Sequence, residues 1–472
     1  MKMWSGRFRQ PLDPEFERWQ RSFGFDRRLL QYELAASSAH ARALKDAGIL
    51  SADELISILH GLQQIGAQAA ASPAFLEDNE AEDVHHFIEK KLAASIGETG
   101  YKLHSGRSRN EQIATDLRLY VRAAIDRLRV EIAELCGVAA DRAERMGDSA
   151  MPAYTHLQRA EAVLVGHWLM AYVEMFLRDV GRLADCRKRL NVCPLGSGAV
   201  AGATLPLDRK FMAETLGFDE PTSNSIDATS DRDFAIEFVN ALSLLALHLS
   251  RWAEEMILFS SQEYGFVILP EAYSTGSSAM PQKKNPDLLE LVRGKAGRVI
   301  GHATGLMVTL KGLPLAYNKD LQETQEALFD SADTMLAMLP LVTGFMKTVE
   351  FNLDRMGQAA QTGFTNAWAA ATYLVKRGVP SRLAHERIGK AVQLCVERNC
   401  ELQDLTLDEL HGLDPAFDAD FYNSLNLAAV LAVHDVPGGT APGRVRQAIK
   451  NARKHIESLR EEIHAHAQSD LA

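Results

Sequence analysis

Five long stretches of this chain have the pattern of long helices, and they constrain its fold more than any other feature. They cover residues 112–145, 161–190, 231–264, 288–311 and 322–347. The first contains no proline, and the third contains neither proline nor glycine. A run of 34 residues would be roughly 50 Å long as a helix, which is too long for a compact small domain. We therefore predict an extended helical bundle that other subunits complete.

Shorter helices are expected on both sides of this bundle. Apolar residues recur at helical spacing over residues 27–70, where Ser51 and Glu54 form a capping signal. After about residue 359, glycine and proline break the helical pattern repeatedly. Strand-like alternation is scarce. The sequence thus predicts an all-α protein with three domains around a long central bundle, covering residues 1–106, 107–358 and 359–472.

The composition indicates which partners the chain can have and in which cellular compartment it works. The chain has 62 acidic and 51 basic residues, a net charge of −11, which argues against a nucleic-acid partner. It has no run of about 18 apolar residues and no signal-peptide core, so we expect no membrane partner. Its five cysteines are scattered and form no CxxC pair, which is typical of reduced thiols. A cytoplasmic location is expected.

The segment from Gly276 to Asp287 carries the strongest chemical signal. In order, it holds a glycine, two serines, two lysines and a helix start (GSSAMPQKKNPD). Gly276 permits unusual backbone angles, Asn285 suits an N-cap, and Pro286 suits the first helical position. Hydroxyls beside fixed positive charge suit a carboxylate substrate. A surface loop with solvated lysines is the alternative, but the segment taken as a whole favours a site.

A second segment places a charge at another helix start. Ser108 and Glu111 form a capping box that puts Arg109 and Asn110 in the first turn of a long helix. Free N–H groups at a helix start bind anions well, although a plain cap is the commoner use of such a serine. Arg109 opposes the helix dipole there. A bound anion would explain why Arg109 stands at this unfavourable position.

A third segment contains a histidine. Thr155 and Gln158 form a candidate capping box that would place His156 in a first helical turn. A helix N-terminus disfavours the protonated imidazole, so His156 would be neutral and able to accept a proton. A structural histidine is the alternative. The residues from Tyr317 to Gln322 likewise precede the fifth long stretch.

Two other segments bear on bound groups. Residues 196–202 have the wrong glycine spacing for a dinucleotide-binding motif, so a turn or close packing is expected there. Residues 82–86 contain candidate metal ligands, but no HExxH motif or cysteine cluster accompanies them. A structural or hydrogen-bonding role is expected for residues 82–86. We therefore predict no cofactor and no metal.

Several segments together resemble a known family. The 276–287 segment resembles the signature loop of the fumarase/aspartase superfamily of lyases. The segments that narrow the resemblance to the argininosuccinate lyases are Met3–Phe8, His104–Asn110, Thr155–Gln158, Asn224–Asp227, Ser230–Phe234 and Ala316–Gln322. They occur in the family's order along the chain.

The resemblance implies a cofactor-free β-elimination that splits argininosuccinate into arginine and fumarate, a step of arginine biosynthesis. A base removes a proton beside a carboxylate, an aci-carboxylate dianion forms, and the bond to the guanidinium nitrogen breaks. Ser277 would be the base, while Lys283 would lower its pKa and, with Asn285, hold the carboxylate. His156, paired with Glu290, would be the proton relay or the acid. The reverse assignment, with His156 as base and Ser277 as acid, stays open.

The resemblance also implies a substrate-binding set and an assembly. The implied substrate-binding residues are Ser22, Asp26, Arg109, Asn110, Thr155, Asn285, Tyr317, Gln322 and Gln325. Three subunits of a homotetramer build each active site of the family, and their long helices form its central bundle. One position departs from the family, because Gln325 stands where a lysine binds substrate. Weaker carboxylate binding is expected unless another cation substitutes.

The sequence leaves two alternative functions open. A sibling fumarate-producing lyase, such as adenylosuccinate lyase, fumarase or aspartase, would differ at the site for the other half of the substrate. A non-enzymatic protein on the same scaffold, like the δ-crystallins, would have lost catalytic positions. The presence of His156, Ser277 and Lys283 argues against the second alternative.

Overall fold

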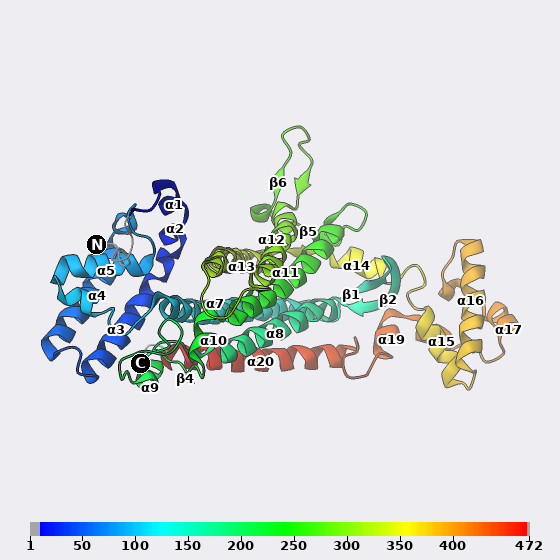
Figure 1. The fold of residues 1–472 in the computed structure, drawn as a ribbon. Helices are drawn as coiled ribbons and strands as arrows, with labels where there is room; N and C mark the ends of the chain where they lie inside the picture. Colours follow the sequence, from blue (N-terminus) through cyan, green and yellow to red (C-terminus); the bar gives the residue numbers. More distant parts are fainter. Residues whose placement is uncertain (1–9, 470–472) are drawn as a thin grey trace.

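The computed structural model describes residues 10–469, which form an elongated and mainly helical molecule (Figure 1). A group of N-terminal helices lies at one end, long helices form the middle, and short C-terminal helices lie at the other end. The predicted all-α fold class is confirmed, since the described strands are few and short.

Long helices build the middle of the molecule. They are α7 (Arg109–Arg145), α8 (Val165–Leu190), α11 (Asp233–Ser260), α12 (Asp287–Leu310), α13 (Glu323–Thr348) and α20 (Pro442–Ser469). The first five correspond to the predicted stretches. Trp252 of α11 is fully buried, and its ring meets Phe345 of α13 edge-on with centroids 5.5 Å apart. Pro340 lies inside α13 without ending it.

One of the described helices, α11, is long and apolar enough to cross a membrane. However, 61% of its most apolar window is buried inside the protein, where α11 packs against α8 and α12. Such burial is typical of the core helix of a bundle.

The N-terminal helices pack beside the start of α7. They are α1 (Pro14–Trp19), α2 (Phe23–Asp26), α3 (Leu30–Asp46), α4 (Ala52–Ala71), α5 (Val84–Ile96) and α6 (Thr99–Lys102), with the 3-10 helices η1 (Arg27–Leu29) and η2 (Pro73–Leu76). The predicted capping box of α4 is confirmed. Ser51 N–H donates to Glu54 Oε2 at 2.9 Å, and Glu54 N–H donates to Ser51 Oγ at 3.2 Å.

Short strand pairs join the long helices. They are β1 (Ala150–Thr155) with β2 (Gln158–Leu164), β3 (Val192–Cys193) with β4 (Glu220–Pro221), β5 (Val267–Ile268) with β8 (Glu350–Phe351), and β6 (Thr275–Gly276) with β7 (Lys284–Asn285). Between them lie α9 (Arg209–Thr215), α10 (Ser225–Ser230), η3 (Glu271–Tyr273) and η4 (Lys319–Gln322). The second predicted helix therefore begins at Val165 and not at Glu161, because the preceding residues pair with β1.

Short helices follow towards the C-terminus, and residues 364–425 among them form a separate hydrophobic cluster. They are α14 (Leu353–Ala359), α15 (Ala367–Lys376), α16 (Ser381–Arg398), η5 (Leu402–Asp404), α17 (Leu407–Leu413), α18 (Phe421–Leu425) and α19 (Leu427–Ala432). Leu374, Cys395, Phe417 and Phe421 lie at the centre of this cluster. Beyond it, α20 returns along α7 to the middle of the molecule (Figure 1). The division of the chain at residues 106 and 358 stays a prediction.

Candidate active site

The strands β6 and β7 form a hairpin that projects from the start of α12 (Figure 1). Ser277 follows β6 and is half-buried. Its Oγ accepts the N–H of Ala279 at 3.3 Å and the N–H of Met280 at 3.1 Å. Lys283 N–H donates to the Met280 carbonyl at 3.1 Å and closes the loop. Two N–H donors on one hydroxyl oxygen favour negative charge on that oxygen.

The base of this hairpin corrects two sequence predictions. α12 begins at Asp287 with Pro286 at its N-cap, so Asn285 is not the cap and Pro286 is not the first helical residue. Asn285 instead lies in β7 and donates from Nδ2 to the Gly276 carbonyl at 3.2 Å. Asp287 Oδ2 accepts Thr275 Oγ1 at 2.6 Å. Gly276 has ordinary strand geometry, so its conformational freedom is not what the hairpin needs.

His156 occupies the turn between β1 and β2, which overturns the predicted helix start. Thr155 pairs with Gln158, and the two turn residues His156 and Leu157 have φ values of 53° and 57°. Two consecutive positive φ angles are what a two-residue hairpin turn requires. The sequence lacks the Asn-Gly signal of such turns, which is why the hairpin was missed. The helix N-terminus predicted at His156 is therefore absent.

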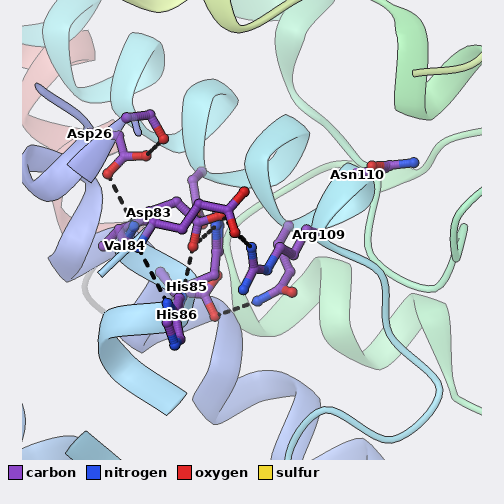
Figure 2. A network of polar contacts seen from close by, with 12 residues as sticks. Asp26, Asp83, Val84, His85, His86, Arg109 and Asn110 are labelled. Atoms are coloured by element: carbon purple, nitrogen blue, oxygen red, sulfur yellow. Dashed lines mark hydrogen bonds and ion pairs between the residues drawn. The ribbon is translucent and has the colours of Figure 1, made fainter. Parts of the chain in front are cut away.

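Two carboxylates anchor Arg109 at the start of α7 (Figure 2). Arg109 Nη1 donates to Asp83 Oδ2 at 2.9 Å and lies 3.3 Å from Glu82 Oε2. The predicted capping box is confirmed, since Ser108 N–H donates to Glu111 Oε1 at 3.0 Å. The carboxylates of Glu82 and Asp83 thus compensate the positive charge of Arg109 at the start of α7, while its predicted role in binding an anionic substrate stays a prediction.

Asp26 is a buried carboxyl next to this network. Its Oδ2 accepts Ser22 Oγ at 2.6 Å, and its Oδ1 accepts the Val84 N–H at 3.0 Å (Figure 2). Burial, followed by the charge of Asp83, raises the pKa of the Asp26 carboxyl to about 7. Asp26 is therefore partly protonated at neutral pH.

A buried cluster of His85, Asp116 and Glu33 lies behind Asp83, and the sequence did not predict the part of Asp116 and Glu33 in it. His85 Nε2 lies 3.0 Å from Asp116 Oδ2 and 3.7 Å from Glu33 Oε2. Burial opposes the imidazolium, but hydrogen bonds with Asp116 and Asp83 raise the pKa of His85 well above its usual value. The predicted hydrogen-bonding role of residues 82–86 is thus confirmed. Asp116 could have been found as an acidic residue on the buried face of α7.

The segment before α13 lies against the same network. Gln322 Nε2 donates to the Gln20 carbonyl at 3.1 Å, and Lys319 Nζ lies 3.7 Å from Glu82 Oε1. Gln325 lies in the first turn of α13 and is buried. Its Oε1 has no hydrogen-bond partner within residues 10–469. A buried amide oxygen without a donor is costly, so this position is unusual for a glutamine.

The predicted site residues fall into three separate places in one chain (Figure 1). Around α2 and the start of α7 lie Ser22, Asp26, Arg109, Asn110, Tyr317, Gln322 and Gln325. At the β1–β2 turn lie Thr155 and His156. At the β6–β7 hairpin lie Ser277, Lys283 and Asn285, and Glu290 follows in the first turn of α12. The 37 residues of α7 put roughly 55 Å between the first place and β1.

The predicted pair of His156 and Glu290 is not formed within the chain. In the described part of the molecule, no hydrogen bond or ion pair joins them, and Glu290 Oε1 lies 3.9 Å from Arg293 Nη2. Asn110 also faces away from the Arg109 network in Figure 2, and its Nδ2 donates to the Ala199 carbonyl at 3.4 Å. A single chain therefore does not bring the predicted catalytic and binding groups together.

Comparisons with known proteins cover the whole chain. A family model described as Lyase matches residues 6–301, and one described as Argininosuccinate lyase C-terminal matches residues 364–432. The argininosuccinate lyase of Koribacter versatilis is 60% identical over 99% of this chain and 100% of its own. That of Acidobacterium capsulatum is 55% identical over 100% of this chain and 97% of its own.

Solved structures agree in fold. A doubly substituted variant of EDDS lyase with bound fumarate has a TM-score of 0.85 and 26% identity, over 98% of this chain and 94% of that one. A class II fumarase from Schistosoma mansoni has a TM-score of 0.72 over 84% of this chain and 89% of that one, and at 15% identity it shows the fold alone. The sequence matches extend over the whole chain and the fold agrees with them. This chain belongs to the argininosuccinate lyase family of the fumarase/aspartase superfamily.

Proposed function

We propose that this chain cleaves argininosuccinate into arginine and fumarate by β-elimination. Membership of the argininosuccinate lyase family supports the substrate. The observation that carries the mechanism is the Ser277 turn, in which two N–H groups donate to one hydroxyl oxygen at 3.1 and 3.3 Å. These donors stabilise the alkoxide that a serine needs in order to act as a base.

In the proposed reaction, Ser277 removes the proton from the carbon beside a substrate carboxylate. Lys283 and Asn285 hold that carboxylate while it becomes a dianion. Donors of this kind contribute about 3–4 kcal/mol each, and an activated base contributes roughly 10²–10⁴-fold. The C–N bond then breaks, and His156, supported by Glu290, delivers a proton to the leaving nitrogen.

The predicted site residues around α2 and the start of α7 fit the arginine half and the carboxylates of the substrate. A guanidinium group placed against Asp26 would favour its ionised form, so substrate binding would release the proton that burial retains. The carboxylates of Glu82 and Asp83 hold Arg109 in one orientation. We propose that Ser22, Asn110, Tyr317, Gln322 and Gln325 line the same site.

We propose a homotetramer in which three subunits supply the three places. Large apolar side chains are exposed along the long helices of the single chain, namely Leu244 and Leu247 of α11, Leu291, Ile300, Met307 and Val308 of α12, and Leu341 of α13. Exposed apolar side chains in such number favour association with copies of the same chain. Leu157, which is 65% exposed at a positive φ, fits insertion into a neighbouring subunit.

Fumarate formation tests the proposal directly. The purified enzyme is given argininosuccinate or adenylosuccinate in separate reactions, and the ultraviolet absorbance of fumarate is followed. We expect fumarate from argininosuccinate only, with arginine formed in equal amount. Fumarate from adenylosuccinate alone would overturn the substrate assignment, and no fumarate from either substrate would overturn the proposed activity.

A further inference from the structure

The end of α16 holds two cysteines in a defined helix-ending turn. After Arg398, Asn399 adopts a left-handed conformation with φ 52° and ψ 50°. Cys400 N–H donates to the Cys395 carbonyl at 3.0 Å, and Asn399 N–H donates to the Val396 carbonyl at 3.3 Å. This pair of bonds defines a Schellman motif, which commonly brings the side chains of its first and last residues into contact. Here both of those residues are cysteines.

The backbone hydrogen bond fixes how far apart the two cysteines are. Standard bond lengths and the 3.0 Å N–H···O=C bond hold the Cα atoms of Cys395 and Cys400 within about 7 Å of each other. Disulfides form at Cα separations up to about 7 Å. The turn therefore keeps both thiols within reach of each other without unfolding α16.

The two thiols differ in their access to solvent. Cys395 is fully buried in the C-terminal hydrophobic cluster, whereas Cys400 is partly exposed. Burial, followed by a hydrogen bond with the Cys400 thiol, raises the pKa of Cys395 to about 12. An oxidant from solvent therefore meets Cys400 first, with Cys395 directly behind it.

The other cysteines of the chain have a different environment. Cys136, Cys186 and Cys193 are buried, and they lie in different elements of the long-helix region. Burial raises the pKa of each of these thiols, as it does that of Cys395, and it shields them from an oxidant in solvent, which reaches the partly exposed Cys400. They serve as internal controls for the reactivity of Cys400.

We propose that Cys395 and Cys400 form a redox-sensitive dithiol that a peroxide oxidises to an intramolecular disulfide. The Cys400 thiolate attacks one peroxide oxygen, the O–O bond breaks, and a sulfenic acid and one water form. The Cys395 sulfur then attacks the Cys400 sulfur, and the S–O bond breaks as the disulfide forms and a second water leaves. The two thiols lose their electrons to the peroxide, and their protons leave in the two waters.

The disulfide would protect Cys400 from further oxidation. Once the disulfide forms, Cys400 is no longer a sulfenic acid that further peroxide could convert to the irreversible sulfinic acid. In Figure 1, α16 lies at the end of the molecule away from both the start of α7 and the β6–β7 hairpin. The disulfide therefore lies away from these two places of the site, and a thiol reductant is expected to restore both thiols.

Peptide mapping of the intact, oxidised enzyme tests the proposal. Trypsin cleaves after Arg398 and so separates Cys395, in residues 391–398, from Cys400, in residues 399–444. After hydrogen peroxide treatment and alkylation, we expect these two peptides to be joined and to separate on reduction. If Cys400 becomes sulfenic or sulfinic acid while the two peptides remain separate, the proposal is wrong. It is also wrong if Cys400 stays a free thiol under peroxide.

Variants show whether Cys395 is the resolving thiol. In Cys395→Ala, we expect peroxide to convert Cys400 to sulfinic acid, which the wild type largely avoids. In Cys400→Ser, Cys395 should stay reduced, and the matched control Cys193→Ala should still form the joined peptides. Equal sulfinic acid at Cys400 in the wild type and in Cys395→Ala would refute the protective role. Circular dichroism checks that each variant is folded, and the wild-type peptide map decides the proposal even if a variant is not.

Discussion

At the scale of single residues, the Ser277 hydroxyl gives the sharpest test of the chemistry. Ser277→Ala removes the proposed base, together with the oxygen that accepts the Ala279 and Met280 N–H groups. We expect kcat to fall by roughly 10²–10⁴-fold with a small change in KM. The matched control is Ser278→Ala, because Ser278 is the exposed neighbour in the same loop. A fall of less than tenfold in Ser277→Ala, or an equal fall in both variants, would contradict the assignment.

Asp26 predicts a pH dependence of stability. Its pKa is raised from 3.8 to about 7, so the folded protein retains a proton that the unfolded chain has lost between these values. Stability therefore falls as pH rises from about 4 to 7, by an amount on the order of 4 kcal/mol if the site stays dry. Asp26→Asn should lose this part of the pH dependence.

Denaturant unfolding at pH 5 and pH 8 measures the effect of Asp26→Asn. The loss of stability between the two pH values should be smaller in the variant than in the wild type. Asp53→Asn, which changes an exposed carboxyl in the first turn of α4, should behave as the wild type does. An identical pH dependence of wild type and Asp26→Asn would show that Asp26 does not retain the proton.

Replacing Gln325 with lysine tests whether the absence of the family's lysine at this position weakens substrate binding. Gln325→Lys should lower KM for argininosuccinate by roughly tenfold, because a hydrogen bond to a charged group is worth about 1.5–3 kcal/mol. Gln325→Met, which has a similar size and no charge, should not lower KM. If Gln325→Lys leaves KM unchanged, residue 325 does not contact the substrate carboxylate.

At the scale of elements, the N-cap of α7 links helix stability to the site. Ser108→Ala removes the side-chain acceptor of the Asn110 N–H and should cost about 1 kcal/mol of folding free energy. It also frees the first turn that carries Arg109, so KM should rise. The control is Ser51→Ala in the capping box of α4, which should cost similar stability and leave KM unchanged. Equal KM values in the two variants would show that the Ser108 cap does not affect substrate binding.

The β1–β2 and β6–β7 hairpins show where element prediction failed and why. Helical spacing and capping boxes are local patterns, so the long helices and the caps at Ser51 and Ser108 were predicted correctly. The turn at His156 depends on the pairing of β1 with β2, and the sequence carries no common turn signal there. At the second hairpin, the pairing of β6 with β7 takes Asn285 into a strand and moves the helix start to Asp287.

At the scale of the whole molecule, the separation of the three places predicts complementation. Chains with His156→Asn and chains with Ser277→Ala should each be nearly inactive alone. When the two are co-expressed, a site that takes His156 from one chain and Ser277 from the other is intact, so roughly a quarter of wild-type activity should return with random mixing. Chains that carry both changes should not recover when mixed with either single variant. Absence of recovery in mixed tetramers, confirmed by mass, would place both residues in one subunit's site.

The sequence by itself determined the long helices, their caps and the family, because these depend on local spacing and on motifs within single segments. Only the tertiary structure decided which groups face each other. Arg109 contacts Glu82 and Asp83, and burial beside Asp83 raises the pKa of Asp26. Such contacts join residues far apart in the chain, and their energies depend on burial, which local sequence patterns do not fix. The separation of the three groups of predicted site residues was likewise decided by the tertiary structure. The motifs suggested that these residues meet, but the length of α7 keeps them apart within one chain.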